Sequence, residues 1–295
     1  MPPEFLVIGH VVQDLSPQTS EDKADGWRLG GTASYAALLA TRLGLRTAVL
    51  TAAAPDLPLE EALPGTEIAR VPSNRSTQFR NVYTAQGRVQ YVLQRAPLIT
   101  PASLPDGWRD AGIVLLGPVA GEVDTALADC FPQALIGVSA QGWLREIGPD
   151  SRVRPVPPER WQGDPLLRQA HVLFLSDEDV PPSSTPVLEK WSRRVDTLAY
   201  TSGEHGAEVC HRGAWRHIDP FPVKPVDPTG AGDIFATAFL VRYQESGDPW
   251  QATRFAACAA ALIIESDGLA DIPDRATIES RLQAHPEIVP RQAHR

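Results

Sequence analysis

The residues best suited to chemistry lie in one segment, Asp227-Pro-Thr-Gly-Ala-Gly-Asp233, which runs directly into an apolar stretch beginning at Ile234. The small residues at 230–232 leave successive backbone N–H groups unobstructed, and a helix N-terminus adds positive potential, so the segment is suited to bind an anion. Asp233 has two interpretations. It could cap the helix, or it could accept a proton from a hydroxyl that attacks the phosphorus atom of that anion.

The elements before this segment follow the order of an α/β protein. Phe5-Leu-Val-Ile-Gly9 is an apolar run typical of a buried parallel strand, and Gly30-Gly31 introduce a helix that ends near Gly44. The next strand is predicted over 46–51, so the opening pattern is strand, excursion, helix and strand. This order predicts a doubly wound, mostly parallel sheet flanked by helices.

Residues 77–93 alternate apolar and polar side chains around Ala85-Gln86-Gly87, which predicts a hairpin with one solvent-exposed face. Together with the polar excursion at 15–29, the segment 75–95 could form a small β lid beside the main sheet. A plain surface hairpin is the alternative, and the sequence favours neither.

The rest of the chain continues the alternation of strands and helices. Strands are expected at 113–116, 134–138, 171–175 and 198–201, a hairpin at 209–218, and helices at 234–244 and 250–264. Asp248 and Pro249 are residue types favoured at a helix N-cap and at the first helical position. Because no repeat or linker composition interrupts the chain, a single domain is predicted over 1–295.

Composition and charge exclude several classes of partner. The 295 residues carry a formal net charge of −9, which argues against sequence-independent binding to nucleic acid, since that needs a surplus of Lys and Arg. No apolar run approaches the ~20 residues that span a bilayer, and the N-terminus lacks the pattern of a signal peptide. Cys130, Cys210 and Cys258 form no cluster typical of zinc. We therefore expect a cytoplasmic protein whose partner is a small molecule, with no nucleic acid and no membrane involved.

The segment 227–233 resembles the C-terminal signature of the ribokinase-like, or PfkB, carbohydrate kinases, Asp-x-Thr-Gly-Ala-Gly-Asp before a helix. Its six fixed positions would arise by chance in a chain of this length with a probability on the order of 10⁻⁵. The resemblance implies that the amides of Gly230, Ala231 and Gly232 form an anion hole for the transferring phosphoryl group. It also implies that Asp233 is the catalytic base.

Further positions match the family in the expected order. The resemblance implies that Asp227 and Thr229 help to bind a monovalent cation, such as K⁺. Asp14, in Gly-His-Val-Val-Gln-Asp, is similar to an aspartate that hydrogen-bonds substrate hydroxyls, and Gly30 and Gly31 are similar to paired glycines that let the backbone approach the substrate. An aspartate in a loop is otherwise usually solvated or capping.

The segment 201–206, Thr-Ser-Gly-Glu-His-Gly, is similar to the family's Thr-x-Gly-x-x-Gly loop. This implies that Thr201, Gly203 and Gly206 contact nucleotide phosphates, although such a short motif could also be a generic turn. Tyr35 departs from the pattern, because the family commonly has Asn there. The departure leaves the fold expectation intact but weakens the expectation of a ribose-like or fructose-like acceptor.

Ser176-Asp-Glu-Asp179 falls where the family has Asn-x-x-Glu, a motif that orders the metal and the water around the phosphates. Asp179 could therefore organise Mg²⁺ through water, since magnesium usually keeps several waters and needs few carboxylates. A solvated acidic turn is the alternative. Two further features are also open. Gln141-Gly-Trp-Leu-Arg145 could present polar groups to a ligand or form a structural loop, and His10 is better explained as a hydrogen-bonded loop histidine than as a ligand or base.

The resemblance extends from Phe5 to the region of Ile278, and the pattern Gly-Gly-x-x-Ser-Tyr at 30–35 is similar to the compact branch that includes plant inositol kinases. It implies an enzyme that uses ATP and Mg²⁺ to phosphorylate a hydroxyl of a sugar, a polyol such as inositol, or a related compound. A nucleoside kinase and a non-catalytic sugar or nucleotide sensor are the alternatives. The oligomeric state is open between a monomer and a homodimer through the lid.

Overall fold

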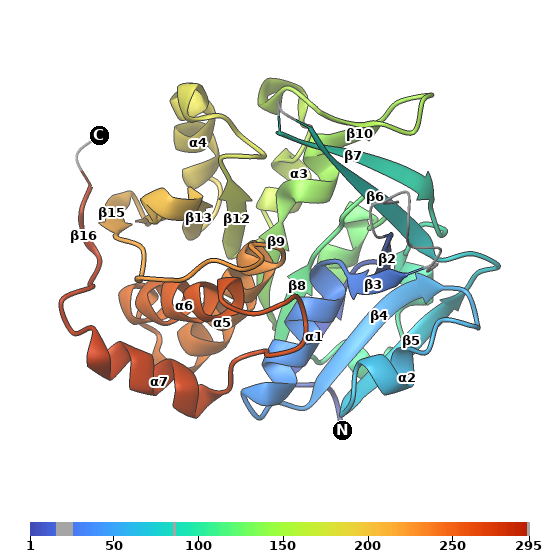
Figure 1. Ribbon diagram of the computed structural model, residues 1–295, viewed down its shortest axis with the longest axis horizontal. Coiled ribbons are helices and arrows are strands. Elements are labelled where there is room, and N and C mark those ends of the chain that lie inside the picture. Colours follow the sequence, from blue (N-terminus) through green and yellow to red (C-terminus); the bar gives the residue numbers. More distant parts are fainter. Residues whose placement is uncertain (16–25, 85–86, 294–295) are drawn as a thin grey trace.

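The computed structural model describes residues 1–15, 26–84 and 87–293 as an α/β protein built on two sheets (Figure 1). The larger sheet has ten strands in the described part of the chain. In spatial order they are β16 (Arg291–Gln292), β15 (Ala214–Ile218), β14 (Ala207–His211), β13 (Thr197–Thr201), β12 (Val172–Ser176), β9 (Leu135–Ser139), β8 (Ile113–Leu116), β1 (Phe5–Ile8), β4 (Thr47–Ala53) and β5 (Thr66–Pro72).

The strands from β13 to β5 are all parallel, whereas β14, β15 and β16 pair antiparallel at one edge. The central strands are buried on both faces, which explains why they read as continuous apolar runs. The mostly parallel, doubly wound sheet predicted from the sequence is confirmed.

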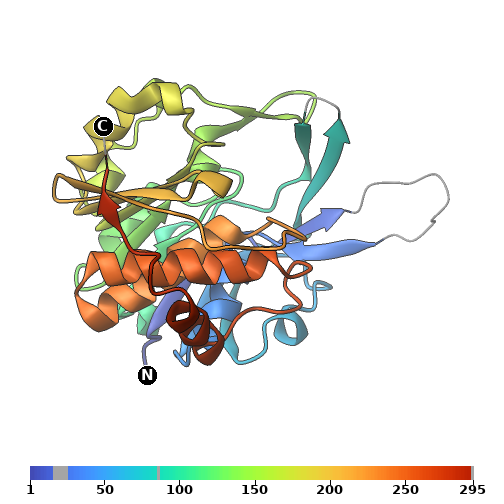
Figure 2. The ribbon, with the colours of Figure 1, turned by 60° about the vertical axis from the view of Figure 1, so that its left-hand side comes forward.

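Helices cover the two faces of the large sheet unequally. One face carries the long helices α1 (Thr32–Arg42), α5 (Ala231–Ser246), α6 (Pro249–Ile264) and α7 (Arg275–Ala284), and Figures 1 and 2 show α5 and α6 side by side. The other face carries α3 (Asp164–Leu167), α4 (Thr185–Ser192) and short 3₁₀ segments such as Thr125–Cys130, and α2 (Leu59–Ala62) precedes β5 at the sheet edge. None of the described helices combines the length and apolar character needed to cross a bilayer.

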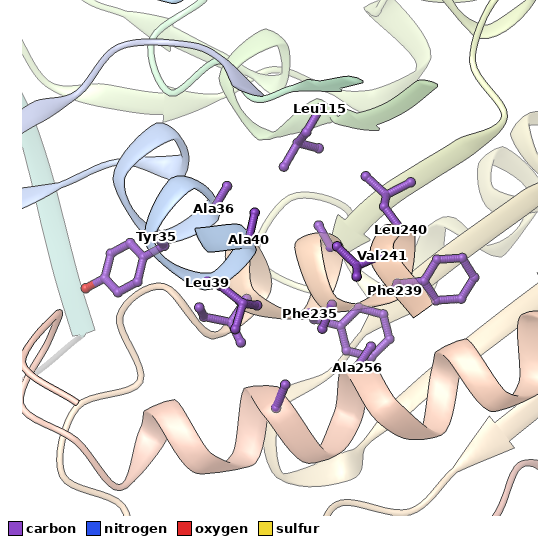
Figure 3. Close-up of a cluster of buried hydrophobic side chains, with 14 of the residues drawn as sticks. Tyr35, Ala36, Leu39, Ala40, Leu115, Phe235, Phe239, Leu240, Val241 and Ala256 are labelled. Atoms are coloured by element: carbon purple, nitrogen blue, oxygen red, sulfur yellow. The ribbon is translucent and has the colours of Figure 1, made fainter. Parts of the chain in front are cut away.

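The core is divided into two layers by the large sheet. Phe5 and Val7 point into the layer beneath α1, α5 and α6, while Leu6 and Ile8 point into the opposite layer. This alternation follows from the two-residue period of a strand. Figure 3 shows Leu39 of α1 and Phe235 and Phe239 of α5 among the buried side chains of the first layer.

The second, smaller sheet has the order β3 (Trp27–Gly30), β2 (Val12–Leu15), β6 (Thr77–Thr84) and β7 (Gly87–Gln94). We call these four strands the small sheet. It contains the described parts of both predicted lid segments, 15–29 and 75–95; residues 16–25 and 85–86 of those segments lie outside the described residues. The hairpin predicted over 77–93 is confirmed as β6 and β7.

Two elements differ from the sequence expectation. β5 was not predicted, because its half-exposed residues show neither a continuous apolar run nor strict alternation. The connection from β9 to β12 contains a two-stranded hairpin, β10 (Arg145–Ile147) and β11 (Val153–Pro155), in place of a simple crossover helix. Through this hairpin the chain contacts the small sheet, since the Val92 N–H of β7 donates to the Ser151 carbonyl at 2.9 Å.

Candidate active site

A cleft lies where the small sheet, the loops after β12 and β13, and the start of α5 meet. It brings together ten of the thirteen residues proposed from the sequence: Asp14, Gly31, Asp179, Thr201, Gly203, Thr229, Gly230, Ala231, Gly232 and Asp233. The other three, Gly30, Gly206 and Asp227, are absent from its described lining but are neighbours of residues in it. The carboxyl ends of parallel strands are where such α/β sheets bind ligands.

The glycine turn before α5 has the geometry of an anion-binding site. Gly230 adopts a φ of 82° and serves as the N-cap of the helix. The Ala231 N–H donates to the Pro228 carbonyl at 3.2 Å, so this amide is engaged within the turn, which differs from the prediction that all three amides are available. Within the described residues no acceptor is found for the N–H groups of Gly230, Gly232 and Asp233. The accessible amides are therefore those on either side of Ala231.

Asp233 lies in the first turn of α5, half-buried in the lining of the cleft. No side-chain hydrogen bond caps this helix in the described structure, so capping does not explain the aspartate. Burial raises the pKa of Asp233 to about 6, although the Thr32 hydroxyl and the positive charge of Arg145 both act to lower it. A carboxylate with that pKa is a competent proton acceptor near neutral pH.

The glycines of the α1 turn make room for Asp14 and for the backbone. A Cβ atom at position 30 would collide with the Asp14 carboxylate, and one at Gly31 would lie 2.7 Å from the His10 carbonyl oxygen. Gly31 also has a φ of 85°. These contacts explain the glycine pair physically, because any side chain would displace the aspartate or strain the turn.

Tyr35 occupies the space behind the glycine turn of α5. Its ring contacts Gly230, and its hydroxyl end points away from the cluster of Leu39 and Phe235 (Figure 3). Burial and the nearby Asp233 carboxylate raise the pKa of Tyr35 well above its ordinary value, so the phenol stays protonated. Tyr35 thus shapes the part of the cleft beside the glycine turn of α5.

Ser176 and Asp179 are a hydrogen-bonded pair at the end of β12. The Ser176 N–H and hydroxyl donate to the Asp179 Oδ2 atom at 3.0 and 2.8 Å. Asp179 is buried, and desolvation raises its pKa. Among the described residues no group of three or more His, Cys, Asp or Glu side chains could hold a metal ion, although Asp177, Glu178 and Asp179 all line the cleft. Organisation of Mg²⁺ through water by Asp179 stays a prediction.

Of the three residues in the loop after β13 that were predicted to contact nucleotide phosphates, two line the cleft. Thr201 and Gly203 line the cleft, whereas Gly206, with a φ of 80°, packs against the Ile218 carbonyl and shapes the loop. Asp227 likewise has a local contact, since its Oδ1 atom accepts the Thr229 N–H at 2.9 Å. Binding of a monovalent cation by Asp227 and Thr229 stays a prediction.

Sequence reasoning missed several residues of the cleft lining, among them Thr32, Asn81 and Gln90. Asn81 and Gln90 face each other across β6 and β7, and Gln90 Nε2 donates to Asn81 Oδ1 at 2.9 Å. Their positions on either side of the predicted hairpin turn could have paired them. Thr32 is the first residue of α1, and its buried side chain lines the cleft close enough to Asp233 to lower the pKa of that carboxyl.

The 141–145 segment is in part a structural loop, and its contact with a ligand stays a prediction. Gln141 and Arg145 line the cleft, while the Trp143 indole N–H donates to the Val123 carbonyl at 3.1 Å as part of the structural loop. His10 is a hydrogen-bonded loop histidine, as expected: it is buried, and Nδ1 and Nε2 contact the Thr77 hydroxyl and the Pro97 carbonyl.

Comparison with known proteins agrees with the resemblance drawn from the sequence. A sequence profile described as pfkB family carbohydrate kinase matches residues 173–275, which include Asp179, the loop 201–206 and the segment 227–233. This part of the chain is thus similar to the PfkB carbohydrate kinases. The profile and the named kinases among the relatives support a phosphotransferase with an alcohol group as acceptor.

Among the similar curated proteins, the cytidine kinase of Thermococcus kodakarensis is 28% identical over 263 residues, covering 81% of this chain and 88% of that protein. The inositol 3-kinase of Zea mays is 32% identical over 146 residues, 48% of this chain and 36% of its own.

Solved structures agree with the fold. A pyrophosphate-dependent ribokinase-family kinase complexed with a pyrophosphate analogue and myo-inositol matches with a TM-score of 0.77 and 20% identity, covering 95% of this chain and 99% of that one. Arabidopsis thaliana ribokinase complexed with ribose and ATP matches with a TM-score of 0.73 and 21% identity, covering 96% and 99%.

Proposed function

We propose that this protein is a PfkB-type kinase that transfers the terminal phosphoryl group of ATP to a hydroxyl of a small polyhydroxylated compound, such as a sugar or inositol, with Asp233 as the base. One observation carries the proposal. Asp233 lies in the same cleft as Asp14. Its own backbone N–H and that of Gly232 have no acceptor within the described residues, and the pKa of its carboxyl is raised to about 6. A proton acceptor adjacent to an anion site is what an in-line phosphoryl transfer needs.

The other residues take supporting roles in this proposal. Asp14 and the Gly30-Gly31 backbone orient the acceptor, and Asn81 and Gln90 present amide groups to it from the small sheet. Thr201 and Gly203, which also line the cleft, contact the donor phosphates. Mg²⁺, organised through water by Asp179, would neutralise charge on the transferring group.

Two finer points have alternatives supported by particular relatives. The similarity to a cytidine kinase over most of both chains supports a nucleoside as acceptor. The likeness to a kinase complexed with a pyrophosphate analogue supports pyrophosphate as an alternative donor. A non-catalytic sensor is disfavoured because Asp233 and its neighbouring amides are intact and accessible.

The test is a turnover screen with Mg²⁺ and either ATP or pyrophosphate. The acceptor panel contains myo-inositol, ribose, cytidine and a 2-keto-3-deoxy sugar acid, and the products ADP or phosphate are measured. We expect that ADP or phosphate forms only when one particular acceptor of the panel is added, and that this result is the same in every protein preparation. If no acceptor gives ADP or phosphate but calorimetry shows that an acceptor binds, the result would support the sensor instead. A cytoplasmic location, and a monomer or a homodimer through the small sheet, stay predictions.

A further inference from the structure

Arg145 stands at the junction of three parts of the cleft. It is the first residue of β10 and follows the 3₁₀ segment Ala140–Leu144, which continues directly from β9. Because β9 and β12 are parallel neighbours, this segment and the Ser176–Asp179 turn leave the large sheet at the same edge. Among the described residues that line the cleft, Arg145 is the one lysine or arginine.

Its charge acts on two acids of the site, the buried Asp179 and the half-buried Asp233. The positive charge of Arg145 lowers the pKa of Asp179, at the end of β12, and that of Asp233, at the start of α5. The Asp179 charge in turn raises the pKa of Asp233. The guanidinium is therefore within electrostatic reach of two carboxylates that come from different elements.

The described lining of the cleft is rich in negative charge, and Arg145 is its one basic side chain apart from any histidine. The described lining contains five carboxylates, those of Asp14, Asp177, Glu178, Asp179 and Asp233. A phosphate donor brings further negative charge, so cations must accompany it into the cleft. An arginine presents a planar fork of N–H donors that matches two phosphate oxygens and stays charged at all relevant pH values.

The backbone around Arg145 holds it in a fixed frame. Arg145 pairs with Pro155 in the β10–β11 hairpin, and the Val156 N–H donates to the carbonyl of Leu144 at 2.8 Å. The hairpin is anchored to the small sheet through the bond from the Val92 N–H to the Ser151 carbonyl. The backbone around Arg145 is thus connected to the large sheet through β9 and to the small sheet through this hydrogen bond.

We propose that Arg145 binds the phosphoryl group during its transfer, from the β9 side of the cleft, and complements the amides at the start of α5. This inference rests on the proposed function. The negative charge of the transition state is then stabilised by groups on two different elements. These are the backbone N–H groups of Gly232 and Asp233 in α5, and the guanidinium of Arg145, whose hairpin contacts the small sheet. Such preorganised donors are among the largest contributions to phosphoryl transfer.

The first experiment compares Arg145→Gln, Arg145→Lys and Arg154→Gln. Arg154 lies in the same hairpin but is paired with Asp150 on the surface, so its variant controls for damage to the hairpin. We expect Arg145→Gln to lose kcat by roughly 10²–10³-fold, as for other single transition-state donors. Arg145→Lys should recover part of this loss because it keeps the charge, and Arg154→Gln should stay within about twofold of wild type.

A pH profile separates this role from a structural one. The groups that set the pKa of Asp233 are its buried surroundings, Thr32, Asp179 and Arg145. Removing the positive charge should move the acid limb of kcat/KM to higher pH in Arg145→Gln and leave it unmoved in Arg154→Gln. An unchanged kcat and acid limb would overturn the proposal. So would a rise confined to the acceptor KM, because Arg145 would then recognise the acceptor.

A second measurement does not depend on turnover. Binding of magnesium pyrophosphate is followed by calorimetry for the same variants, with folding checked by thermal unfolding. We expect binding to weaken at least tenfold in Arg145→Gln and to be retained in Arg154→Gln. If no acceptor is ever phosphorylated but this difference is seen, the proposed function fails and the phosphate-binding role of Arg145 stands. Equal binding by wild type and Arg145→Gln would refute the role itself.

Discussion

The ring of Tyr35 lies directly against the Cα atom of Gly230, so that a Cβ atom at position 230 would overlap three atoms of the ring. Gly230 also has a φ of 82°, a conformation that L side chains rarely adopt. Position 230 therefore excludes a side chain for two independent reasons. Together the glycine and the tyrosine hold the turn that presents the amides of Gly232 and Asp233.

Gly230→Ala should consequently damage both stability and catalysis. Backbone strain and overlap with the Tyr35 ring are expected to lower the free energy of unfolding by about 1–3 kcal/mol, and a displaced turn should lower kcat on the order of 10²-fold. Gly44→Ala is the control, because Gly44 has a φ of 93° but no atom lies near its Cβ position. Urea unfolding and turnover are measured for both. Equal behaviour of the two variants would show that the contact with Tyr35 is unimportant.

Asp233→Asn separates catalysis from stability. The amide cannot accept the acceptor's proton, so kcat should fall by roughly 10²–10⁴-fold. Burial raises the pKa of this carboxyl from 3.8 to about 6, which means that its charged form destabilises the fold at neutral pH. The variant should therefore be more stable by about 1–3 kcal/mol at pH 7, seen as a rise of several degrees in Tm.

The matched control for Asp233→Asn is Asp248→Asn in the next helix. Asp248 accepts the backbone N–H groups of Trp250 and Gln251 at the start of α6, and these bonds lower its pKa. Its charged form therefore stabilises the fold, and the control should lose stability while keeping kcat. A loss of stability in Asp233→Asn, or near-normal turnover, would contradict the assignment of the base.

The pH dependence of activity should follow the same carboxyl group. Asp233 must be ionised to act as a base, so kcat/KM should rise with pH up to about 6 and level off above it. The Thr32 hydroxyl lowers this pKa, and Thr32→Val should accordingly move the acid limb to higher pH. Stability should change with pH in the opposite direction to activity. Because the pKa in the folded state is above the unfolded value, the contribution of Asp233 to the free energy of unfolding decreases as pH rises from about 4 to about 6. An acid limb near pH 4 would refute the raised pKa.

Much of the architecture could be predicted because its signals are local. Apolar runs marked β1, β8, β9, β12 and β13, and the capping pair Asp248-Pro249 marked the start of α6. The glycine turns could be placed because each carries a positive φ that favours glycine. These signals depend on neighbours in the chain, which the sequence shows directly.

The rest depends on contacts between distant segments. Arg145 acts on Asp179 and Asp233 only because β9, β12 and α5 converge, and no spacing in the sequence encodes that convergence. The engagement of the Ala231 amide by Pro228 is likewise a matter of turn geometry. Sequence could name the glycine turn but not which of its amides stays accessible.

Asp179 offers a test of the predicted Mg²⁺ role. Asp179→Asn removes the charge but keeps a side chain that can contact Ser176, so the fold should persist. We expect the Mg²⁺ concentration for half-maximal activity to rise at least severalfold, because a carboxylate orders metal-bound water better than an amide does. Glu189→Gln on the exposed face of α4 is the control. An unchanged Mg²⁺ requirement would leave Asp179 a purely structural acid.

The base of the small sheet is held by a buried histidine. Pro97 can only accept, so His10 Nε2 carries the proton that the Pro97 carbonyl accepts at 3.0 Å, and Nδ1 accepts the Thr77 hydroxyl at 2.7 Å. The same hydroxyl accepts the Ala96 N–H at 3.0 Å. Burial lowers the pKa of His10, which keeps the ring neutral. His10 thus joins the first residue of β6 to the chain leaving β7.

Thr77→Val should therefore loosen the small sheet. It leaves His10 Nδ1 and the Ala96 N–H without a buried partner, which is expected to cost about 1–3 kcal/mol, to speed hydrogen exchange in β6 and β7, and to raise the acceptor KM. Thr41→Val is the control, because the Thr41 hydroxyl makes one long contact, 3.4 Å, to Thr66. If both variants lose the same stability and exchange in β6 is unchanged, His10 does not anchor the sheet. If exchange rises while the acceptor KM stays constant, the sheet is anchored there but does not help to bind the acceptor.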